Sequence, residues 1–192
     1  MAGRLVLVRH GATEWSTGGQ HTGRTDIPLL LEGEGQAAAA GAYLRSTGWV
    51  FDRVLTSPLR RAADTCRLTG FTAEIEPDLM EWDYGEYEGI ASPEIREGRP
   101  QWTLWEHGVP GGERAGDVGR RVDRVIQRAR GQTGDTLCVA HGHVLRVLAA
   151  RWLGLPPVAG RLFLLSVGAV CVLGYEGPAG AVELWNFVPD PV

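Results

Sequence analysis

Short apolar runs alternate with longer amphipathic stretches along the first 150 residues of the chain. Short runs rich in Val and Leu are typical of buried strands. Three of them lie at residues 4–9, 52–56 and 136–140, and residues 74–76 predict an edge strand. Near the end of the chain, three further strands are expected at residues 162–165, 169–175 and 182–187.

The amphipathic stretches predict four helices, at residues 32–47, 60–68, 113–130 and 143–153. The pattern is clearest in the third, where apolar side chains recur on one helical face: Val118, Val122, Val125, Ile126 and Ala129. The first is expected to be helical despite three glycines, because alanines dominate it. Residues 10–31 and 82–112 are expected to be irregular.

Strands that alternate with helices predict an α/β fold. We expect three layers, α/β/α, around a mostly parallel central sheet. The chain has 192 residues, enough for one domain with a sizeable core. Because no linker or internal repeat interrupts the pattern, a single domain over residues 1–192 is expected.

Composition and charge exclude several functions. The net charge is −4, without the basic excess that a general nucleic-acid binder needs. All 19 basic residues are arginine, which excludes Schiff-base chemistry and a Walker phosphate loop, since both require lysine. No apolar run approaches the ~20 residues that span a bilayer, and the amino terminus does not resemble a signal peptide. No membrane association is therefore expected.

The three cysteines are Cys66, Cys138 and Cys171, an odd number without metal-ligand spacing. They are expected to be free, mostly buried thiols in a reducing compartment. Together with the absence of a signal peptide, this predicts a cytoplasmic protein.

Two histidine–glycine pairs directly follow two of the predicted strands. His10-Gly11 follows residues 4–9, and His141-Gly142 follows residues 136–140. In an open α/β sheet, ligands bind beyond the carboxyl ends of the strands. Two histidines at such ends can face each other across a crevice, and the glycines let the backbone approach a ligand closely. The alternative is that each histidine only packs or caps.

Arg9-His10-Gly11-Ala12-Thr13 resembles the signature of the histidine phosphatase superfamily, which includes phosphoglycerate mutases, acid phosphatases and sugar bisphosphatases. Further motifs follow in the family's order: Thr22-Gly23, the segment 57–65 with Arg61, the segment 79–89 with Glu81, and His141-Gly142. The resemblance covers most of residues 4–153. It implies a phosphoglycerate mutase-like fold and a catalytic set of Arg9, His10, Arg61, Glu81 and His141.

In the chemistry that the resemblance implies, His10 attacks the phosphoryl group and forms a phosphohistidine. The nearby cations of Arg9 and Arg61 would keep the imidazole neutral while binding phosphoryl oxygens. His141 would donate to an oxygen that gains charge in the transition state. Glu81 would protonate the leaving alcohol.

As a general acid, Glu81 must carry a proton when the substrate binds. Its neighbours in the sequence, Trp82 and Tyr84, are expected to favour the neutral carboxyl group, as is the bound phosphate.

A second group of residues is expected to bind the substrate: Ser16, His21, Thr22, Gly23, Tyr84, Gly142 and Arg146. Ser16, Thr22 and the backbone N–H of Gly23 would donate to phosphate, although many relatives carry Asn at the Ser16 position. By resemblance to sedoheptulose-1,7-bisphosphatase, Arg146 would bind a second phosphate, the alternative being a surface ion pair. Trp102, Trp105 and His107 are open to interpretation as a lid or as packing residues.

Neither a metal nor another cofactor is expected. The spacing of His141 and His143 invites a zinc site, but the sequence places no Asp or Cys to complete a ligand set.

Three functions compete. A phosphatase passes the phosphoryl group from His10 to water, a mutase passes it to another hydroxyl, and a phosphate-binding protein only holds it. All five implied catalytic residues are present, which disfavours the third. Mutases of this kind carry a longer insertion that covers the site, whereas only residues 82–140 separate Glu81 from His141 here. The sequence therefore favours a phosphatase acting on small phosphorylated metabolites such as sugar phosphates. It leaves a homodimer open.

Overall fold

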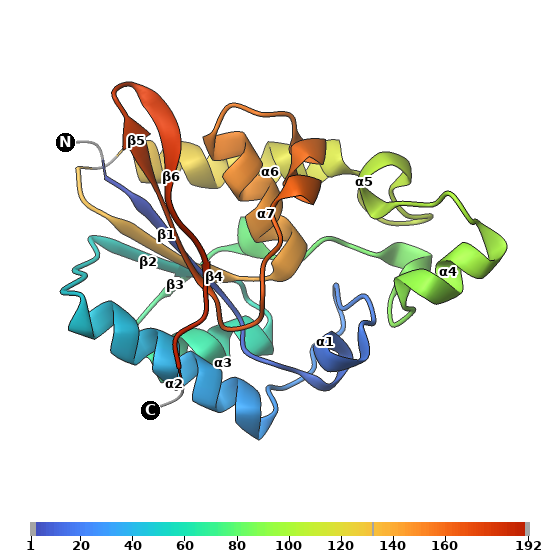
Figure 1. The fold of residues 1–192 in the computed structure, drawn as a ribbon, viewed down its shortest axis with the longest axis horizontal. Helices are drawn as coiled ribbons and strands as arrows, with labels where there is room; N and C mark the ends of the chain where they lie inside the picture. Colours follow the sequence, from blue (N-terminus) through green and yellow to red (C-terminus); the bar gives the residue numbers. More distant parts are fainter. Residues whose placement is uncertain (1–2, 132, 191–192) are drawn as a thin grey trace.

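The computed structural model describes residues 3–131 and 133–190. The ends of the expected domain, residues 1–2 and 191–192, lie outside the described residues, as does residue 132. Within the described chain, six strands form one sheet in the order β3-β2-β4-β1-β5-β6 (Figure 1). They are β1 Leu5–Arg9, β2 Arg53–Thr56, β3 Glu74–Ile75, β4 Thr136–Ala140, β5 Val170–Glu176 and β6 Ala179–Phe187.

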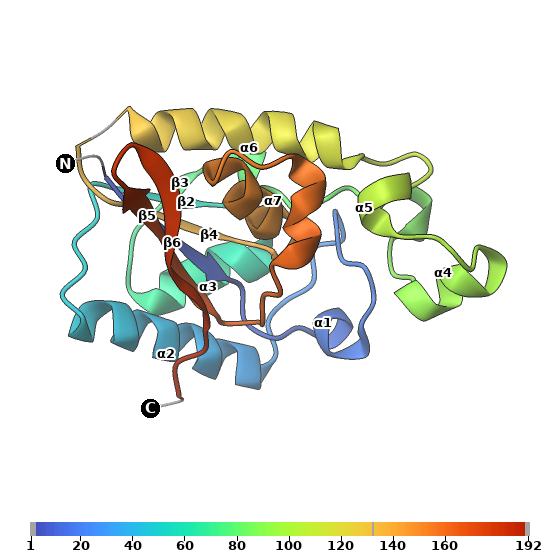
Figure 2. The same cartoon turned by 45° about the horizontal axis from the view of Figure 1, so that its top comes forward.

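Helices cover both faces of the sheet (Figure 2). The α-helices are α1 Glu14–Gly18, α2 Leu31–Ser46, α3 Arg60–Thr69, α4 Ser92–Gly98, α5 Leu104–His107, α6 Ala115–Arg130 and α7 Gly142–Trp152. Short 3-10 helices lie at η1 Pro77–Leu79, η2 Gly85–Tyr87 and η3 Pro157–Leu162. Helices α2 and α3 lie against one face, α6 and α7 against the other, and α4 and α5 lie to one side of the sheet (Figure 1). None of the described helices is long and apolar enough to cross a membrane.

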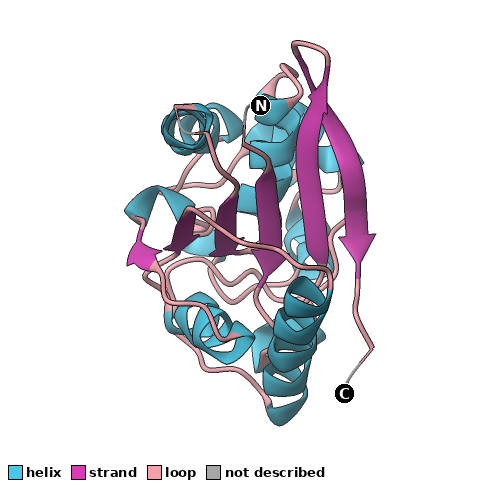
Figure 3. Ribbon diagram, turned by 90° about the vertical axis from the view of Figure 1, so that its left-hand side faces the viewer, coloured by secondary structure: helices cyan, strands magenta, loops and turns pink. Residues whose placement is uncertain are grey.

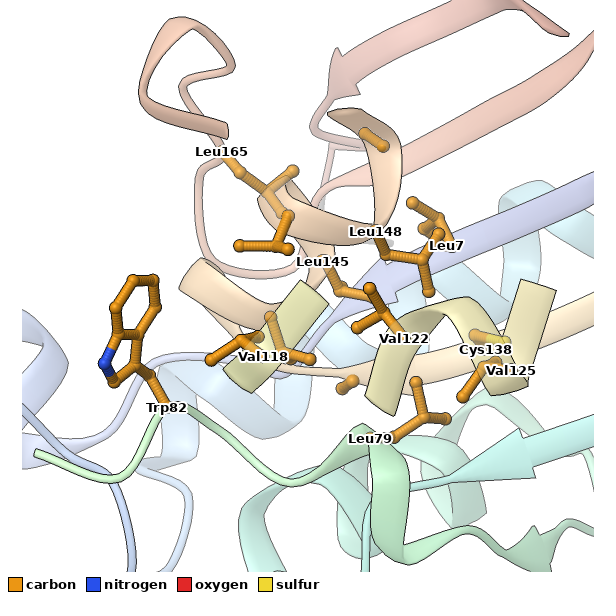
Figure 4. Packing of buried hydrophobic residues seen from close by; sticks show 14 of the residues in the cluster. Leu7, Leu79, Trp82, Val118, Val122, Val125, Cys138, Leu145, Leu148 and Leu165 are labelled. Carbon is orange, nitrogen blue, oxygen red and sulfur yellow. The ribbon is translucent and has the colours of Figure 1, made fainter. Parts of the chain in front are cut away.

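The alternating sides of β1 explain the three layers. Successive side chains of a strand point to opposite faces. Leu5 and Leu7 therefore join the cluster under α6 and α7, while Val6 and Val8 join the cluster over α2 and α3. Figure 4 shows Leu7 packed among side chains of α6 and α7. All five residues predicted for the inner face of α6 are buried, which confirms that helix.

The first four strands of the sheet order are parallel, and β5 and β6 form an antiparallel hairpin at its other edge (Figure 3). Arg9 at the end of β1 is in register with Ala140 at the end of β4. The residues that follow these strands therefore emerge side by side at one edge of the sheet.

The structure corrects several predicted elements. The strand expected at residues 162–165 is absent from the described chain: Leu162 ends η3, and the carbonyls of Leu164 and Leu165 accept side-chain donors of Trp185 and Arg9 in place of strand partners. The region 10–31 contains α1, and the region 82–112 contains η2, α4 and α5. The helix expected from Glu113 begins at Ala115.

Two of the three glycines of α2 are needed for close packing, and the third faces open space. A Cβ atom on Gly41 would lie 2.4 Å from the carbonyl oxygen of Thr69 in α3, and one on Gly33 would lie 2.2 Å from that of Ala12. A Cβ on Gly35 would meet nothing within 4 Å. Gly33 and Gly41 therefore let α2 approach its neighbours closely, while Gly35 only lowers helix propensity.

We expect opposite effects from alanine at these sites. Gly35→Ala should raise the free energy of unfolding by about 0.5–1 kcal/mol, because it removes backbone freedom from the unfolded chain. Gly41→Ala should lower it by about 1–3 kcal/mol, because the new methyl group meets backbone atoms. Urea unfolding of the two variants checks this, and equal changes in both would contradict the packing described.

Candidate active site

Residues from three neighbouring strands meet at the carboxyl edge of the sheet. Ser57 follows β2, His141 follows β4, and His10 follows β1. Backbone hydrogen bonds continue the ladder past the strands, from Ser57 N to the Val139 carbonyl and from His10 N to the Ala140 carbonyl. The rings of His10 and His141 are consequently 5.2 Å apart, centroid to centroid. The two histidine–glycine motifs thus face each other, as predicted.

His10 is held as a neutral imidazole with one open nitrogen. Its Nδ1 lies 2.7 Å from the carbonyl oxygen of Gly11, which can only accept, so Nδ1 carries the proton. Burial and the charges of Arg9 and Arg61 hold the pKa of His10 well below 6.5. The lone pair of Nε2 is therefore available to attack an electrophile at neutral pH.

His141 lies between a cation and a hydroxyl group. Arg61 Nε donates to its Nδ1 at 3.1 Å, so Nε2 carries the proton and donates to Ser57 Oγ at 2.7 Å. Burial and the charge of Arg61 hold the pKa of His141 well below 6.5. The ring is thus a neutral hydrogen-bond donor whose orientation is fixed on both sides.

Arg9 is a partly buried cation with one open, buried donor. Its Nη1 donates to the Leu165 carbonyl at 2.5 Å, while its Nε is buried without a hydrogen-bond partner among the described residues. Burial lowers its pKa, although the negative charge of Glu81 acts in the opposite direction. A buried donor left open on a guanidinium is suited to an anion.

Glu81 is 5% exposed and sits at the amino end of α7. Its Oε1 accepts from the backbone N–H groups of Trp82 and Val144 at 2.8 and 2.9 Å, and its Oε2 accepts from that of His143 at 2.9 Å. These three donors fix the position and orientation of the carboxyl group. The expectation that Glu81 carries a proton when the substrate binds stays a prediction.

Arg9, His10 and Glu81 border a cavity of about 380 Å³, and His141 lies next to His10 but outside its lining. Its wall brings together residues from β1, the loop after it, the segment 81–105 and α7. The lining residues are Arg9, His10, Ser16, Gly19, Gln20, His21, Thr22, Glu81, Tyr84, Ser92, Arg96, Thr103, Leu104, Trp105, Gly142, His143, Arg146 and Leu165. Three arginines and one carboxylate make its charged groups predominantly positive.

One side of the cavity is a hydrogen-bonded aromatic wall. His21 stacks on Tyr84 at 4.6 Å and bonds to Ser92 Oγ at 3.1 Å, and the Tyr84 hydroxyl lies 2.6 Å from His143 Nδ1. Burial lowers the pKa of His21 to about 4 and that of His143 well below 6.5. Both rings are therefore neutral at physiological pH and suited to contact an uncharged part of a ligand.

Of the expected binding residues, Ser16, His21, Thr22, Tyr84, Gly142 and Arg146 line the cavity. The hydroxyl oxygen of Ser16 accepts from the Thr13 backbone N–H at 2.9 Å and so completes the capping box of α1. Gly23 does not line the cavity, and its N–H donates to Glu88 Oε1 at 2.8 Å. In the chain without ligand a carboxylate takes this N–H, and the expected contact with phosphate stays a prediction.

Arg61 lies behind the cavity wall, whereas its expected role places it against the ligand. It is fully buried and absent from the cavity lining. Besides His141, its guanidinium binds the carbonyls of Thr22, Gly23 and Thr25 at 2.9–3.0 Å. Protein carbonyls thus take donors of both terminal nitrogens, and the expected contact with a ligand's oxygens stays a prediction. Its charge nevertheless contributes to the lowered pKa of His10.

Trp102 packs in the core, whereas Trp105 lines the cavity. Trp102 is 3% exposed and donates its indole N–H to the Gly108 carbonyl, and Trp105 stacks under the guanidinium of Arg146 at 4.7 Å. His107 lies outside the cavity wall.

Sequence reasoning missed Ser57, His143 and Arg96 as members of the site or its wall. Ser57 carried a usable signal, because it follows a predicted strand as His10 and His141 do. His143 stands two residues after His141 and was weighed there for a metal. Nothing in the sequence pattern singles out Arg96, which reaches the cavity from α4.

Comparison with known proteins agrees with this geometry. A model of the histidine phosphatase superfamily (branch 1) matches residues 5–188. The chain belongs to this superfamily. It is 42% identical over 176 residues to an acid phosphatase of Mycobacterium tuberculosis, covering 90% of this chain and 87% of that protein.

Two other relatives show the family's range of activities. A sedoheptulose 1,7-bisphosphatase of Saccharomyces cerevisiae is 36% identical, with 79% of this chain and 68% of that protein covered. A 2,3-bisphosphoglycerate-dependent phosphoglycerate mutase of Mesorhizobium japonicum is 35% identical, with 77% of this chain and 80% of that protein covered.

The fold matches the solved structure of an open reading frame product of M. tuberculosis. The TM-score is 0.94 and the identity 38%, and the match covers 98% of this chain and 99% of that one. The predicted phosphoglycerate mutase-like α/β/α fold is confirmed.

The electrostatics of His10 can be measured directly. Its imidazole should stay neutral, with the proton on Nδ1, at pH values well below 6.5 in NMR titrations of ring nitrogens. Arg9→Gln should raise the pKa of His10, because it removes a neighbouring positive charge. Arg67→Gln, an exposed change on α3, serves as the control and should leave the titration unchanged. A wild-type His10 that titrates at 6.5 or above would contradict the arrangement.

Proposed function

We propose that this chain hydrolyses phosphate monoesters of small metabolites, sugar phosphates among them, through a phosphohistidine on His10. One observation carries the proposal: a neutral His10 with an open Nε2 lies beside Arg9, whose buried Nε lacks a protein partner, in a cavity that also holds a carboxylate. A nucleophile, an anion donor and an acid–base group are the three parts that this reaction needs. A cavity of about 380 Å³ suits a small ligand.

In the first step, His10 Nε2 attacks phosphorus, and the bond from phosphorus to the alcohol oxygen breaks. The departing oxygen takes a proton from Glu81. In the second step, the Glu81 carboxylate accepts a proton from water, the water oxygen bonds to phosphorus, and the bond from His10 breaks. Arg9 binds the phosphoryl oxygens in both steps. The buried guanidinium of Arg61 adds positive charge from behind the cavity wall. His141 donates from Nε2 once the phosphoryl group competes with Ser57 for that proton.

The proton on Glu81 arrives with the substrate in this scheme. The two carboxyl oxygens of Glu81 accept from three backbone N–H groups, which hold them beside the cavity. A phosphate dianion bound next to it adds negative charge, which favours the neutral carboxyl group. The binding step and the protonation step are thereby coupled.

Transfer to water is favoured over transfer to a second hydroxyl. A mutase must keep water away from the phosphohistidine. The segment 81–105, which borders the cavity, is anchored to the core by the buried Trp102, and its Ala91 pairs with Gln20 on the other side of the cavity. A segment so anchored is poorly suited to fold over the site.

The substrate would carry a second anionic group. Arg146 is partly buried, stacks on Trp105 and donates to the Gly160 and Arg161 carbonyls, but it has no carboxylate partner among the described residues. A desolvated cation on a cavity wall without an ion-pair partner favours an anionic ligand. A sugar bisphosphate or a phosphorylated acid provides one.

We place the enzyme in the cytoplasm. The proposed scheme uses no cofactor. Cys66, Cys138 and Cys171 are all free and buried, which suits a reducing compartment. The net charge of −4 does not favour nucleic acid as a partner. A homodimer remains a prediction that size-exclusion chromatography with light scattering can test.

The covalent intermediate is testable by trapping. His10→Ala should abolish turnover, and brief exposure of the wild type to a labelled substrate should leave an acid-labile, base-stable label on the protein. EDTA should leave the rate unchanged, since no step uses a metal. More than a few per cent of activity in His10→Ala, or an EDTA loss restored by a divalent metal, would refute this mechanism.

Arg146→Ala should damage one substrate class selectively. A charge-assisted contact with a second anion is worth about 1.5–3 kcal/mol, or roughly tenfold to over a hundredfold in kcat/KM. We expect that loss for a sugar bisphosphate and little loss for a phenyl phosphate. Arg161→Ala, which removes a neighbouring exposed arginine, is the control. Equal losses on both substrates would mean that Arg146 serves the reacting phosphate or the fold.

A further inference from the structure

A buried ion pair lies behind Glu81, outside the cavity. Arg121 of α6 is 8% exposed and binds Glu113 through two hydrogen bonds, from Nε to Oε1 at 2.9 Å and from Nη2 to Oε2 at 3.0 Å. Neither residue lines the cavity. Paired charges of this kind are costly to bury and often contribute little net stability. The role of the pair is therefore best judged from the contacts that it makes with other residues.

The remaining donors of Arg121 all reach the segment that leads to Glu81. Its Nη1 donates to the carbonyls of Asp78 and Met80 at 2.7 and 2.6 Å, and its Nη2 donates to the carbonyl of Glu81 itself at 3.2 Å. One guanidinium thus fixes three carbonyls within four residues. A lysine ammonium, with three donors and no planar fork, would not reproduce this set.

Glu113 fastens the other side of the same segment. Its Oε2 accepts from Asp83 N at 2.9 Å, its backbone N–H donates to the Asp83 carbonyl at 2.9 Å, and its carbonyl accepts the indole N–H of Trp82 at 2.9 Å. The preceding Gly112 allows this approach, because a Cβ there would lie 2.3 Å from the Asp83 carbonyl. The residues on both sides of Glu81 are therefore bound to one ion pair.

We propose that the Arg121–Glu113 pair positions Glu81 for proton transfer to the leaving oxygen, without touching the substrate. The backbone of Glu81 is held by the pair, and its carboxylate is held by the amino end of α7. A misplacement of about 1 Å can cost a factor of 100 in rate. The inference rests on the proposed role of Glu81 and makes Arg121 and Glu113 positioning residues for it.

The dependence on the leaving group separates positioning from general stability. An alkyl phosphate needs its leaving oxygen protonated, whereas a dinitrophenyl phosphate hardly does. In Arg121→Gln and in the isosteric Glu113→Gln, kcat for the alkyl ester should fall about tenfold to a hundredfold. The dinitrophenyl ester should lose less than about threefold in the same variants, because its departure does not use the acid. Arg121→Lys should recover at most part of the alkyl-ester kcat that Arg121→Gln loses.

Arg124→Gln is the matched control. Arg124 lies on the same helix and binds the side chain of Asp78 at 2.5 and 2.8 Å, but it is 56% exposed and makes none of the contacts to the backbone of residues 78–81 described for Arg121. It should leave both substrates unchanged. Circular dichroism and thermal unfolding show whether each variant is folded.

Three results would overturn the proposal: equal losses on both esters, a loss in Arg124→Gln as large as in Arg121→Gln, or failure of both pair variants to fold. The last would show that the pair holds the domain together rather than the acid. Glu81→Gln tests the proposed function separately. If it slows both esters equally, the assignment of Glu81 as the acid fails, whatever the pair does.

Discussion

The parallel, in-register pairing of β1 with β4 is the constraint on which the site depends. It sets the ends of both strands level, so that His10 and His141 leave the sheet side by side. The pairing of β2 with β4 adds Ser57 to the same edge. A slip of one residue would turn each of these side chains to the opposite face. The packing of Leu5 and Leu7 on one face and Val6 and Val8 on the other opposes such a slip.

Burial then determines the charge state of the groups brought together. Arg9 and Arg61 are cations held near two imidazoles, and burial and charge both lower the pKa values of those rings. The histidines stay neutral, and the positive charge stays on guanidinium groups that do not lose their protons. Nucleophilicity and anion binding are thereby assigned to different residues of one cluster.

Much of the fold and of the site could be predicted because the signals are local. A β-branched run followed by His-Gly marks a strand end at His10 and at His141 without reference to the rest of the chain. The surroundings of Glu81 could not be predicted, since two of its donors, the amides of His143 and Val144, are 62 and 63 residues away. The partner of the Gly23 N–H could not be predicted for the same reason, because Glu88 is 65 residues away. The false strand at residues 162–165 failed because side chains took the carbonyls that a strand would need.

The carboxylate of Glu81 at the amino end of α7 has a consequence for how anions enter. A helix amino end is an anion site in its own right, because its first N–H groups have no partners within the helix. Here the carboxyl group of Glu81 takes that place, and the amides of His143 and Val144 are already used. These two amides are therefore not available to a phosphate that enters the cavity. Its donors must come from side chains of the wall, and the open Nε of Arg9 is one of them.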